Sequence, residues 1–316
     1  MTTATASREE PAWYTPSDLP AEIAGSADPI HGGLGVGAPG KVGLLELDLA
    51  SRGSVTRLTR QYQRAPLHIY RPIYLDPALP GMPFIFVQQA GDGLVQGDRY
   101  RVDVDCGPGA SVHLTTQAAT NVFVARQDFA TQLVNLQAGD DALVEYLPDP
   151  VVPFRGSRLF QRVELTAAAS STVIVGETLL PGRVAHGETD AYDLYWSELE
   201  ARRPDGTQLC ADVLRLGALA GAPPRSIGLL DGHEVLSTLW VLTRQLPARE
   251  LVVSLREALI DQPGVLAGAS ELPNGCGAAV RLLASSSRPA RAAMRAAWNA
   301  ARLAVIGVPA PDLRKG

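Results

Sequence analysis

A strand–turn–strand unit recurs along a large part of this 316-residue chain. Its second strands begin at Ala110, Ala142 and Ser171, so the unit returns after 32 and then 29 residues. Each unit joins two apolar segments through a turn of small or acidic residues, GPG, AGDD or AAAS. A period near 30 residues in β sequence predicts that each unit stacks on the next and covers its sheet edges. The alternative is that the units are unrelated hairpins of a β-sandwich.

Period-two apolar spacing and β-branched runs predict strands from residue 42 to about residue 216. The clearest of these predicted strands are 42–50, 99–106, 110–116, 131–137, 142–148, 158–166 and 171–179. The 30 glycines and 24 prolines suit the many turns that such short elements need. We therefore expect a mainly-β fold of elongated, stacked antiparallel sheets, similar to a β-helix.

Two α-helices are predicted near the C-terminus. Leucines recur at four-residue spacing in the first, residues 247–260, which gives it one apolar face. The second, residues 287–306, follows a run of capping serines and ends before Gly307. Two further strands, 264–270 and 277–284, lie between the helices.

The N-terminal region differs from the rest in composition. Residues 1–41 are rich in Ser, Thr, Ala, Gly and Pro and have no apolar periodicity. This composition predicts a flexible tail. Residues 42–316 then form a single β domain that includes both C-terminal helices.

A glycine cluster at the end of this tail imitates a nucleotide-binding loop. Gly35, Gly37, Gly40 and Lys41 satisfy GxGxxG and most of a phosphate-loop pattern. Both patterns bind phosphate only where a strand precedes the loop and a helix follows it. Here no strand is predicted before the loop, and a strand follows at Val42, so the context argues against a nucleotide site.

Four large side chains share one face of the second predicted helix. Arg291, Arg295, Trp298 and Arg302 fall at positions i, i+4, i+7 and i+11. One interpretation is that Trp298 packs on the sheet while the arginine stems cover apolar surface around it. The other is that the four residues form a partner-binding patch, because arginine and tryptophan are frequent in such contacts.

Composition restricts the function class. A net charge of −5 argues against nucleic-acid binding through bulk charge. The chain has no signal peptide and no apolar run of membrane-spanning length, so we expect a cytoplasmic protein without membrane contact. Three separated cysteines and five isolated histidines give neither a thiolate cluster nor a recognisable catalytic set, so no enzyme activity is expected.

Acidic residues stand out within otherwise apolar or glycine-rich strand ends. Asp98 follows a glycine-rich turn, Glu145 lies in ALVEYLP, and Glu177 lies in VIVGETLLPG. A buried carboxylate needs a partner, because its burial otherwise costs several kcal/mol. The carboxylates either accept backbone hydrogen bonds at turns or line a hydrated path for a cation.

An ordered series of motifs identifies a family. The series comprises RAPLHIYRPIY (64–74), GDGLVQGDRYRVDVDCGPGASVHLTTQAATNVF (91–123), LVEYLPDPVVPFRGSR (143–158), GETLLPGRVAHGE (176–188) and AGASELPNGCGAAVRLLA with the helix after it. In this order, from about residue 42 to residue 311, the motifs resemble the UreD family of urease accessory proteins, called UreH in some systems.

The resemblance implies a non-enzymatic scaffold with a stacked β fold. Members of the family bind UreF, which carries the GTPase UreG, and the assembly docks on the urease apoprotein and delivers nickel to it. Ni²⁺ would then be a transient cargo, with no tightly bound cofactor. Asp98, Glu177 and Glu145 match acidic positions of the family's motifs, and the resemblance places them on a nickel path. Such a path suits isolated carboxylates, which exchange nickel more readily than imidazole or thiolate clusters.

Two alternatives come from other functional classes. A nucleotide-dependent enzyme would use the loop from Gly35 to Lys41. A nickel-storage protein would bind the metal tightly and in a fixed ratio, whereas a scaffold hands it on.

Overall fold

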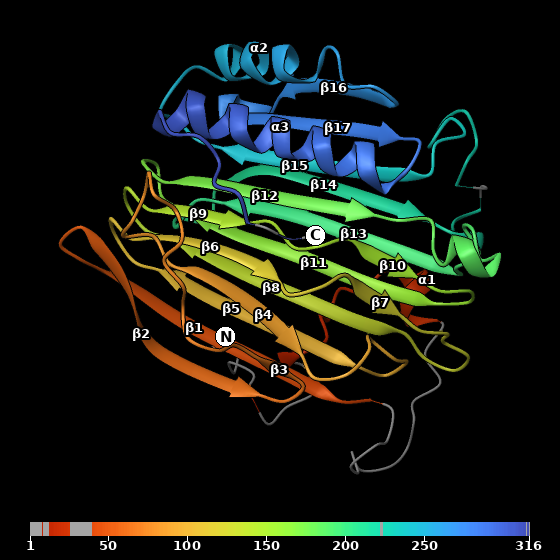
Figure 1. Ribbon diagram of the computed structural model, residues 1–316. Helices are drawn as coiled ribbons and strands as arrows, with labels where there is room; N and C mark the ends of the chain where they lie inside the picture. The colour runs from red at the N-terminus through yellow and green to blue at the C-terminus, as the bar shows by residue number, and fades with distance from the viewer. Residues whose placement is uncertain (1–7, 9–12, 26–39, 222–223, 314, 316) are drawn as a thin grey trace.

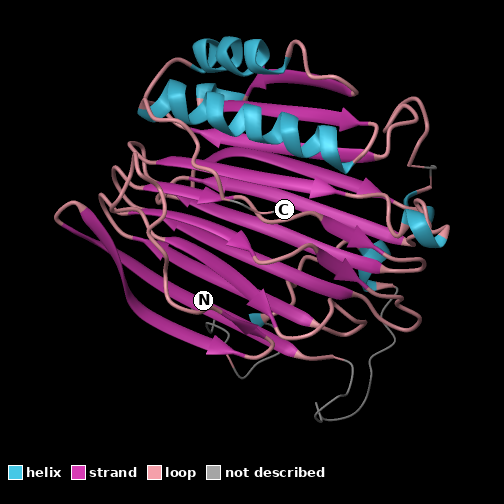
Figure 2. Ribbon diagram, viewed as in Figure 1, coloured by secondary structure: helices cyan, strands magenta, loops and turns pink. Residues whose placement is uncertain are grey.

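The computed structural model consists of two facing β-sheets with two long helices against one of them (Figures 1 and 2). It describes residues 8, 13–25, 40–221, 224–313 and 315. The mainly-β, stacked architecture expected from the repeat is confirmed. Both predicted C-terminal helices are also confirmed, as α2 (Ala248–Leu259) and α3 (Ser287–Ile306).

One sheet has seven strands in the order β14-β13-β11-β8-β5-β1-β2. Their bounds are β1 (Val42–Arg52), β2 (Val55–Arg64), β5 (Arg99–Cys106), β8 (Ala130–Ala138), β11 (Arg158–Ala167), β13 (Leu194–Arg202) and β14 (Gln208–Leu216).

The other sheet has ten strands, eight of them in the order β16-β17-β15-β12-β9-β6-β4-β3, with β7 and β10 beside this row. Their bounds are β3 (Leu67–His68), β4 (Phe84–Gln89), β6 (Ser111–Thr116), β7 (Thr120–Val122), β9 (Leu143–Tyr146), β10 (Val151–Pro153), β12 (Thr172–Leu179), β15 (Val235–Leu242), β16 (Val265–Glu271) and β17 (Gly277–Ala284).

The repeat appears directly in the strand register. Ser111 of β6 lies beside Leu143 of β9, 32 residues later, and Leu143 lies beside Thr172 of β12, 29 residues later. The opposite sheet has the same two steps, from Arg99 to Thr131 and from Ala130 to Leu159. Each unit of the sequence is therefore one coil of the stack.

The expected antiparallel pairing is wrong for the repeating part of the fold. Strands β5, β8, β11 and β13 are parallel to one another, as are β4, β6, β9 and β12. The short turns do not close hairpins, because the two strands that each turn joins belong to opposite sheets. Each strand pairs instead with its equivalent in the next coil, which runs in the same direction. Antiparallel pairing occurs where β2, β3, β14, β15, β16 and β17 extend the sheets.

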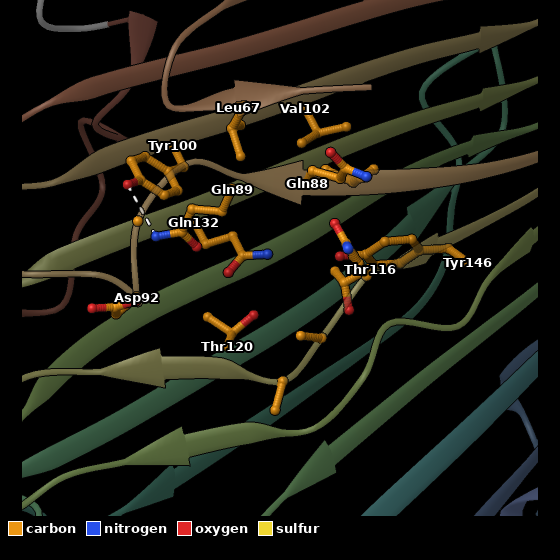
Figure 3. Close-up of a pocket in the computed structure, with 16 residues that line it drawn as sticks. Leu67, Gln88, Gln89, Asp92, Tyr100, Val102, Thr116, Thr120, Gln132 and Tyr146 are labelled. Carbon is orange, nitrogen blue, oxygen red and sulfur yellow. Dashed lines mark hydrogen bonds between the residues drawn. The ribbon is translucent and has the colours of Figure 1, made fainter. Parts of the chain in front are cut away.

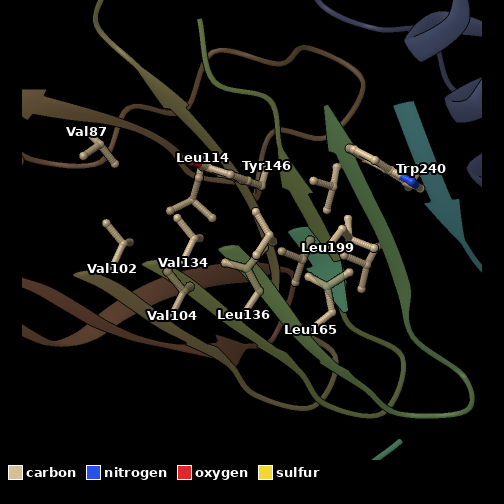
Figure 4. Close-up of a cluster of buried hydrophobic side chains, with 14 of the residues drawn as sticks. Val87, Val102, Val104, Leu114, Val134, Leu136, Tyr146, Leu165, Leu199 and Trp240 are labelled. Atoms are coloured by element: carbon tan, nitrogen blue, oxygen red, sulfur yellow. The ribbon is translucent and has the colours of Figure 1, made fainter. Parts of the chain in front are cut away.

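The main core fills the space between the two sheets (Figure 4). Alternate residues of each strand point inward, as the period-two pattern requires. The inward side chains from the seven-stranded sheet include Val102, Val104, Val134, Leu136, Leu165 and Leu199. They face Val87, Leu114, Tyr146 and Trp240 of the ten-stranded sheet.

A second core lies under α2 and α3, on the outer face of the ten-stranded sheet (Figure 1). Small residues let α3 approach closely, since Ala290, Ala293, Ala297 and Ala301 are all fully buried. Among the described residues, no helix is long and apolar enough to cross a membrane.

Part of the predicted flexible tail is packed. The short helix α1 (Ala21–Ala24) places Ile23, which is fully buried, among Phe129, Phe160 and Leu194 of the seven-stranded sheet. Residues 13–25 of the predicted tail therefore contact the sheet: Tyr14 and Ile23 are buried, and Leu19 packs against the same cluster as Ile23. These few apolar residues create no periodic pattern in the sequence. Gly35 and Gly37 lie outside the described residues.

Candidate functional site

A groove of about 690 Å³ runs between α3, the C-terminal segment and the ends of β6, β9 and β12. Three carboxylates, Asp149, Glu177 and Asp312, line it together with the cationic side chains of Arg291, Arg295 and Lys315. Leu147, Met294 and Trp298 supply apolar parts of its wall.

Glu177 connects this groove with the interior. It lies on β12, and its carboxylate accepts hydrogen bonds from two side chains of β13 in the opposite sheet. The hydroxyl of Tyr195 donates to Oε1 at 2.8 Å, and that of Ser197 donates to Oε2 at 2.6 Å. Burial raises the pKa of Glu177, although both hydroxyls favour its charged form. The carboxylate is therefore held in a fixed orientation between the sheets.

Two smaller cavities continue from the groove into the space between the sheets. A cavity of about 30 Å³ shares Asp149, Glu177 and Thr178 with the groove. A third, of about 220 Å³, shares Thr120 and Gln132 with the second. The third cavity also borders the groove, through Gln117, Ala118 and Ala119, so all three cavities adjoin one another, with oxygen-bearing side chains between them.

Figure 3 shows the third cavity. Many of the side chains that line it are polar, among them Gln89, Asp92, Tyr100, Thr120 and Gln132. The amide of Gln89 donates to the hydroxyl of Tyr100 at 3.2 Å. Burial raises the pKa of Tyr146, so its hydroxyl stays protonated.

Asp98 stands behind this cavity and does not line it. Its carboxylate accepts backbone N–H bonds from Lys41 at 2.8 Å and Val95 at 3.0 Å. The hydroxyl of Tyr100 donates to it at 3.3 Å, and this is its connection to the cavity. Burial raises the pKa of Asp98, while these hydrogen bonds oppose the rise. Asp98 thus fits the alternative interpretation of a turn carboxylate satisfied by backbone donors.

Glu145 lies outside the three cavities, in a fully buried polar network. Its Oε2 is 2.8 Å from Nδ1 of His113, and its Oε1 accepts the indole N–H of Trp298 at 3.2 Å. The guanidinium of Arg302 lies 3.7 Å from the same Oε1. The predicted metal role of Glu145 conflicts with this geometry, because donors and a cation occupy the positions that a metal ion would need.

The predicted partner-binding patch on α3 is divided by the structure. Trp298 is 5% exposed, and Arg302 is fully buried. Nη2 of the Arg302 guanidinium donates to Oδ2 of Asp76 at 2.5 Å. These two residues are therefore not available on the surface. The alternative interpretation, in which Trp298 packs on the sheet, describes Trp298 correctly, and neither interpretation includes the complete burial of Arg302. Arg291 and Arg295 are exposed at the groove, so the patch prediction stays open for them alone.

Sequence reasoning missed the closure of the groove by Lys315. Its ammonium group donates to Oδ2 of Asp149 at 2.8 Å and to Oγ1 of Thr115 at 2.6 Å. Burial lowers the pKa of Lys315, and Asp149 opposes this effect. Lysine occurs only twice in the chain, and this rarity was the one available signal.

Lys41, the last residue of the glycine motif, is followed directly by the strand β1 and not by a helix. The structure therefore gives no support for a nucleotide site at Lys41.

Within the residues that the structure describes, no group of three or more His, Cys, Asp or Glu side chains is placed to hold a metal ion. The carboxylates of the predicted path are therefore separate from one another. Asp98 is connected to the third cavity through Tyr100, whereas Glu177 lines the groove and the second cavity. Glu145 borders none of the three.

Comparison with known proteins agrees with the motif order. Residues 41–315 match the UreD urease accessory protein family. The chain is 45% identical over 283 residues to urease accessory protein UreD 2 of Streptomyces griseus, covering 89% of this chain and 96% of the relative. It is 33% identical over 289 residues to UreD of Cenarchaeum symbiosum, covering 90% and 99%. UreD 2 of Brucella suis is 34% identical over 281 residues, covering 88% and 93%. The chain therefore belongs to the UreD family of urease accessory proteins.

Proposed function

We propose that this protein is a non-catalytic scaffold of urease maturation that guides nickel through its interior and hands it on. Membership of the UreD family is the observation that carries this proposal, since the relatives are named urease accessory proteins. Nickel is here a cargo, and the protein supplies the route and the docking surfaces.

The three adjoining cavities support the proposed route. A carboxylate stands at the groove, where Glu177 attracts a divalent cation, while Asp149 is paired with the ammonium group of Lys315. Amide and hydroxyl oxygens follow at the inner junction, from Gln132 and Thr120. Single oxygen donors bind Ni²⁺ more weakly than sets of imidazoles or thiolates, so an ion can leave each position for the next. Water would complete its coordination at each position.

The proposed partners are UreF, the GTPase UreG recruited through UreF, and the urease apoprotein. The family resemblance supports all three. Arg291 and Arg295 remain the candidate contacts on α3, because both are exposed beside the groove that begins the proposed route.

Reconstitution of urease from purified apoprotein, UreF, UreG and this protein tests the route. We expect Glu177→Gln to reduce the nickel content and activity of the urease, because the amide removes the negative charge and keeps the shape. Thr120→Phe should have the same effect by filling the junction between the two inner cavities. Glu271→Gln and Thr207→Phe make the same chemical changes at exposed positions and should leave urease nickel content unchanged.

Folded Glu177→Gln and Thr120→Phe variants that load urease as well as the wild type would contradict the route. Equilibrium dialysis of the isolated protein with Ni²⁺ separates transit from storage. Weak, rapidly reversible binding is expected, and tight binding in a fixed ratio would instead indicate a storage protein.

A further inference from the structure

A surface separate from the groove lies at the edge of the seven-stranded sheet. It is formed by the edge strand β2 and by the segment 69–75, which runs back along β2. At one end, the backbone N–H of Ile69 donates to Oε1 of Gln63 at 3.1 Å. At the other end, the hydroxyl of Tyr74 donates to the carbonyl of Thr56 at 2.7 Å. We call this surface the basic edge.

Its charge is opposite to that of the whole chain. The chain has a net charge of −5, yet residues 52–75 contain five arginines and no acidic residue or lysine. Arg60 is paired with Glu46 and Asp48. Arg57, Arg64 and Arg71 are exposed, and within the described residues none of them lies in an ion pair. The basic edge therefore presents unneutralised positive charge.

Large apolar side chains are exposed among these arginines. Tyr70 is 72% exposed, Ile73 49% and Tyr74 36%. The guanidinium of Arg57 lies 5.5 Å from the centre of the Tyr74 ring, so charge and aromatic surface adjoin. Tyrosine and arginine are the residues that most often dominate the affinity of protein interfaces.

The backbone of β2 is also paired with a strand on one side only. β2 pairs only with β1 among the described strands, and its outer side makes one backbone contact, from the Thr56 N–H to the Gly81 carbonyl at 2.9 Å. Charges on an edge strand can serve merely to prevent aggregation. That role does not account for Tyr70 and Ile73, because exposed apolar groups would promote aggregation.

We propose that the basic edge is the docking surface for an acidic protein of the urease-maturation assembly. Arg57, Arg64 and Arg71 attract the acidic surface, while Tyr70 and Ile73 supply the apolar contact at its centre. The proposal rests on the proposed function for the existence of the assembly, and it assigns a role to a face distant from the α3 groove (Figure 1).

The test uses the full-length protein and three purified probes: UreF, UreG and the urease apoprotein. Affinities are measured by biolayer interferometry for the wild type and for the charge-reversal variant Arg57→Glu, Arg64→Glu, Arg71→Glu. We expect at least one probe to bind the variant about tenfold more weakly or worse, and its wild-type affinity to fall as salt rises. The uncharged variant Tyr70→Ser, Ile73→Ser should weaken the same probe.

The control variant reverses three exposed arginines elsewhere, Arg126→Glu, Arg244→Glu and Arg249→Glu. It changes the net charge equally and should leave all affinities near the wild-type values. Thermal melting by circular dichroism confirms that each variant is folded.

Unchanged affinity of the charge-reversal variant for every probe overturns the docking proposal and leaves the proposed function intact. Equal losses in the control variant overturn it too, because bulk charge would then explain the effect. If the wild type binds none of the probes, the proposed function fails, and the docking proposal falls with it.

Discussion

The indole N–H of Trp298 donates a 3.2 Å hydrogen bond to Oε1 of Glu145, and the two residues are 153 positions apart. This contact joins α3 to β9 at a fully buried site. His113 and Arg302 approach the same carboxylate, and Arg302 also contacts Asp76. The network therefore fixes how α3 sits on the ten-stranded sheet, and so positions one wall of the groove.

Removal of the Glu145 carboxylate should destabilise the fold. Glu145→Ala leaves Arg302 and the Trp298 N–H without this partner, and breaking a buried ionic network in this way costs about 3–5 kcal/mol. Urea denaturation followed by circular dichroism measures the loss. Glu271→Ala, at an exposed position of β16, should change stability by less than about 0.5 kcal/mol. A stable Glu145→Ala protein that fails to load urease would instead favour the metal role predicted from sequence.

The stability difference between Glu177→Gln and the wild type should depend on pH. Burial raises the folded-state pKa of Glu177 above its unfolded value, so the folded protein binds more protons in the interval between the two pKa values. Wild-type stability therefore falls as pH rises through that interval, from about pH 4 upward. Glutamine does not titrate, so the variant should gain stability relative to the wild type over the same range. Urea midpoints at a series of pH values measure this, with Glu271→Gln as the matched control. A constant difference across pH would show that burial does not disfavour the Glu177 carboxylate.

Docking of the N-terminal segment should depend on Ile23. Truncation to alanine removes a fully buried side chain from its pocket beside Phe129 and Phe160, which costs about 2 kcal/mol or more. We expect faster hydrogen exchange in residues 13–25 and unchanged exchange in the central strands. Val253→Ala, at an exposed position of α2, is the control. Equal exchange in the Ile23→Ala and control proteins would restore the prediction of a free tail.

The repeat was readable from sequence because its turns and apolar alternation are local. Its steps of 32 and 29 residues are the strand register itself, as the Ser111–Leu143 and Leu143–Thr172 pairs demonstrate. Strand direction was not readable, because a turn between opposite sheets has the same small residues as a hairpin turn.

The sequence also did not indicate which charged residues are buried. Arg302 shares a helix face with the exposed Arg295 as well as with the buried Trp298, and its partner Asp76 lies 226 positions earlier, so no local pattern indicates that the pair is internal. The acidic residues were correctly singled out as unusual. Which of them borders a cavity depends on the opposite sheet, as the contacts of Glu177 with Tyr195 and Ser197 illustrate.

The paired thiols of Cys210 and Cys276 should differ in acidity. A hydrogen bond from Cys210 and the nearby charges of Arg203 and Arg244 hold the pKa of Cys276 below its usual range. Burial raises the pKa of Cys106 to about 12, and the bond to Cys276 raises that of Cys210. The ultraviolet absorbance of thiolate should therefore show one transition at lower pH than that of an ordinary thiol in the folded protein.

Substitution identifies the group responsible for this transition. Cys276→Ser should abolish it, while Cys106→Ser should leave it unchanged. Cys210→Ser keeps a hydrogen-bond donor and should preserve a lowered pKa at Cys276, whereas Cys210→Ala should move the transition to higher pH. A low-pH transition that survives in Cys276→Ser would assign the acidic thiol to another cysteine and contradict the proposed pairing.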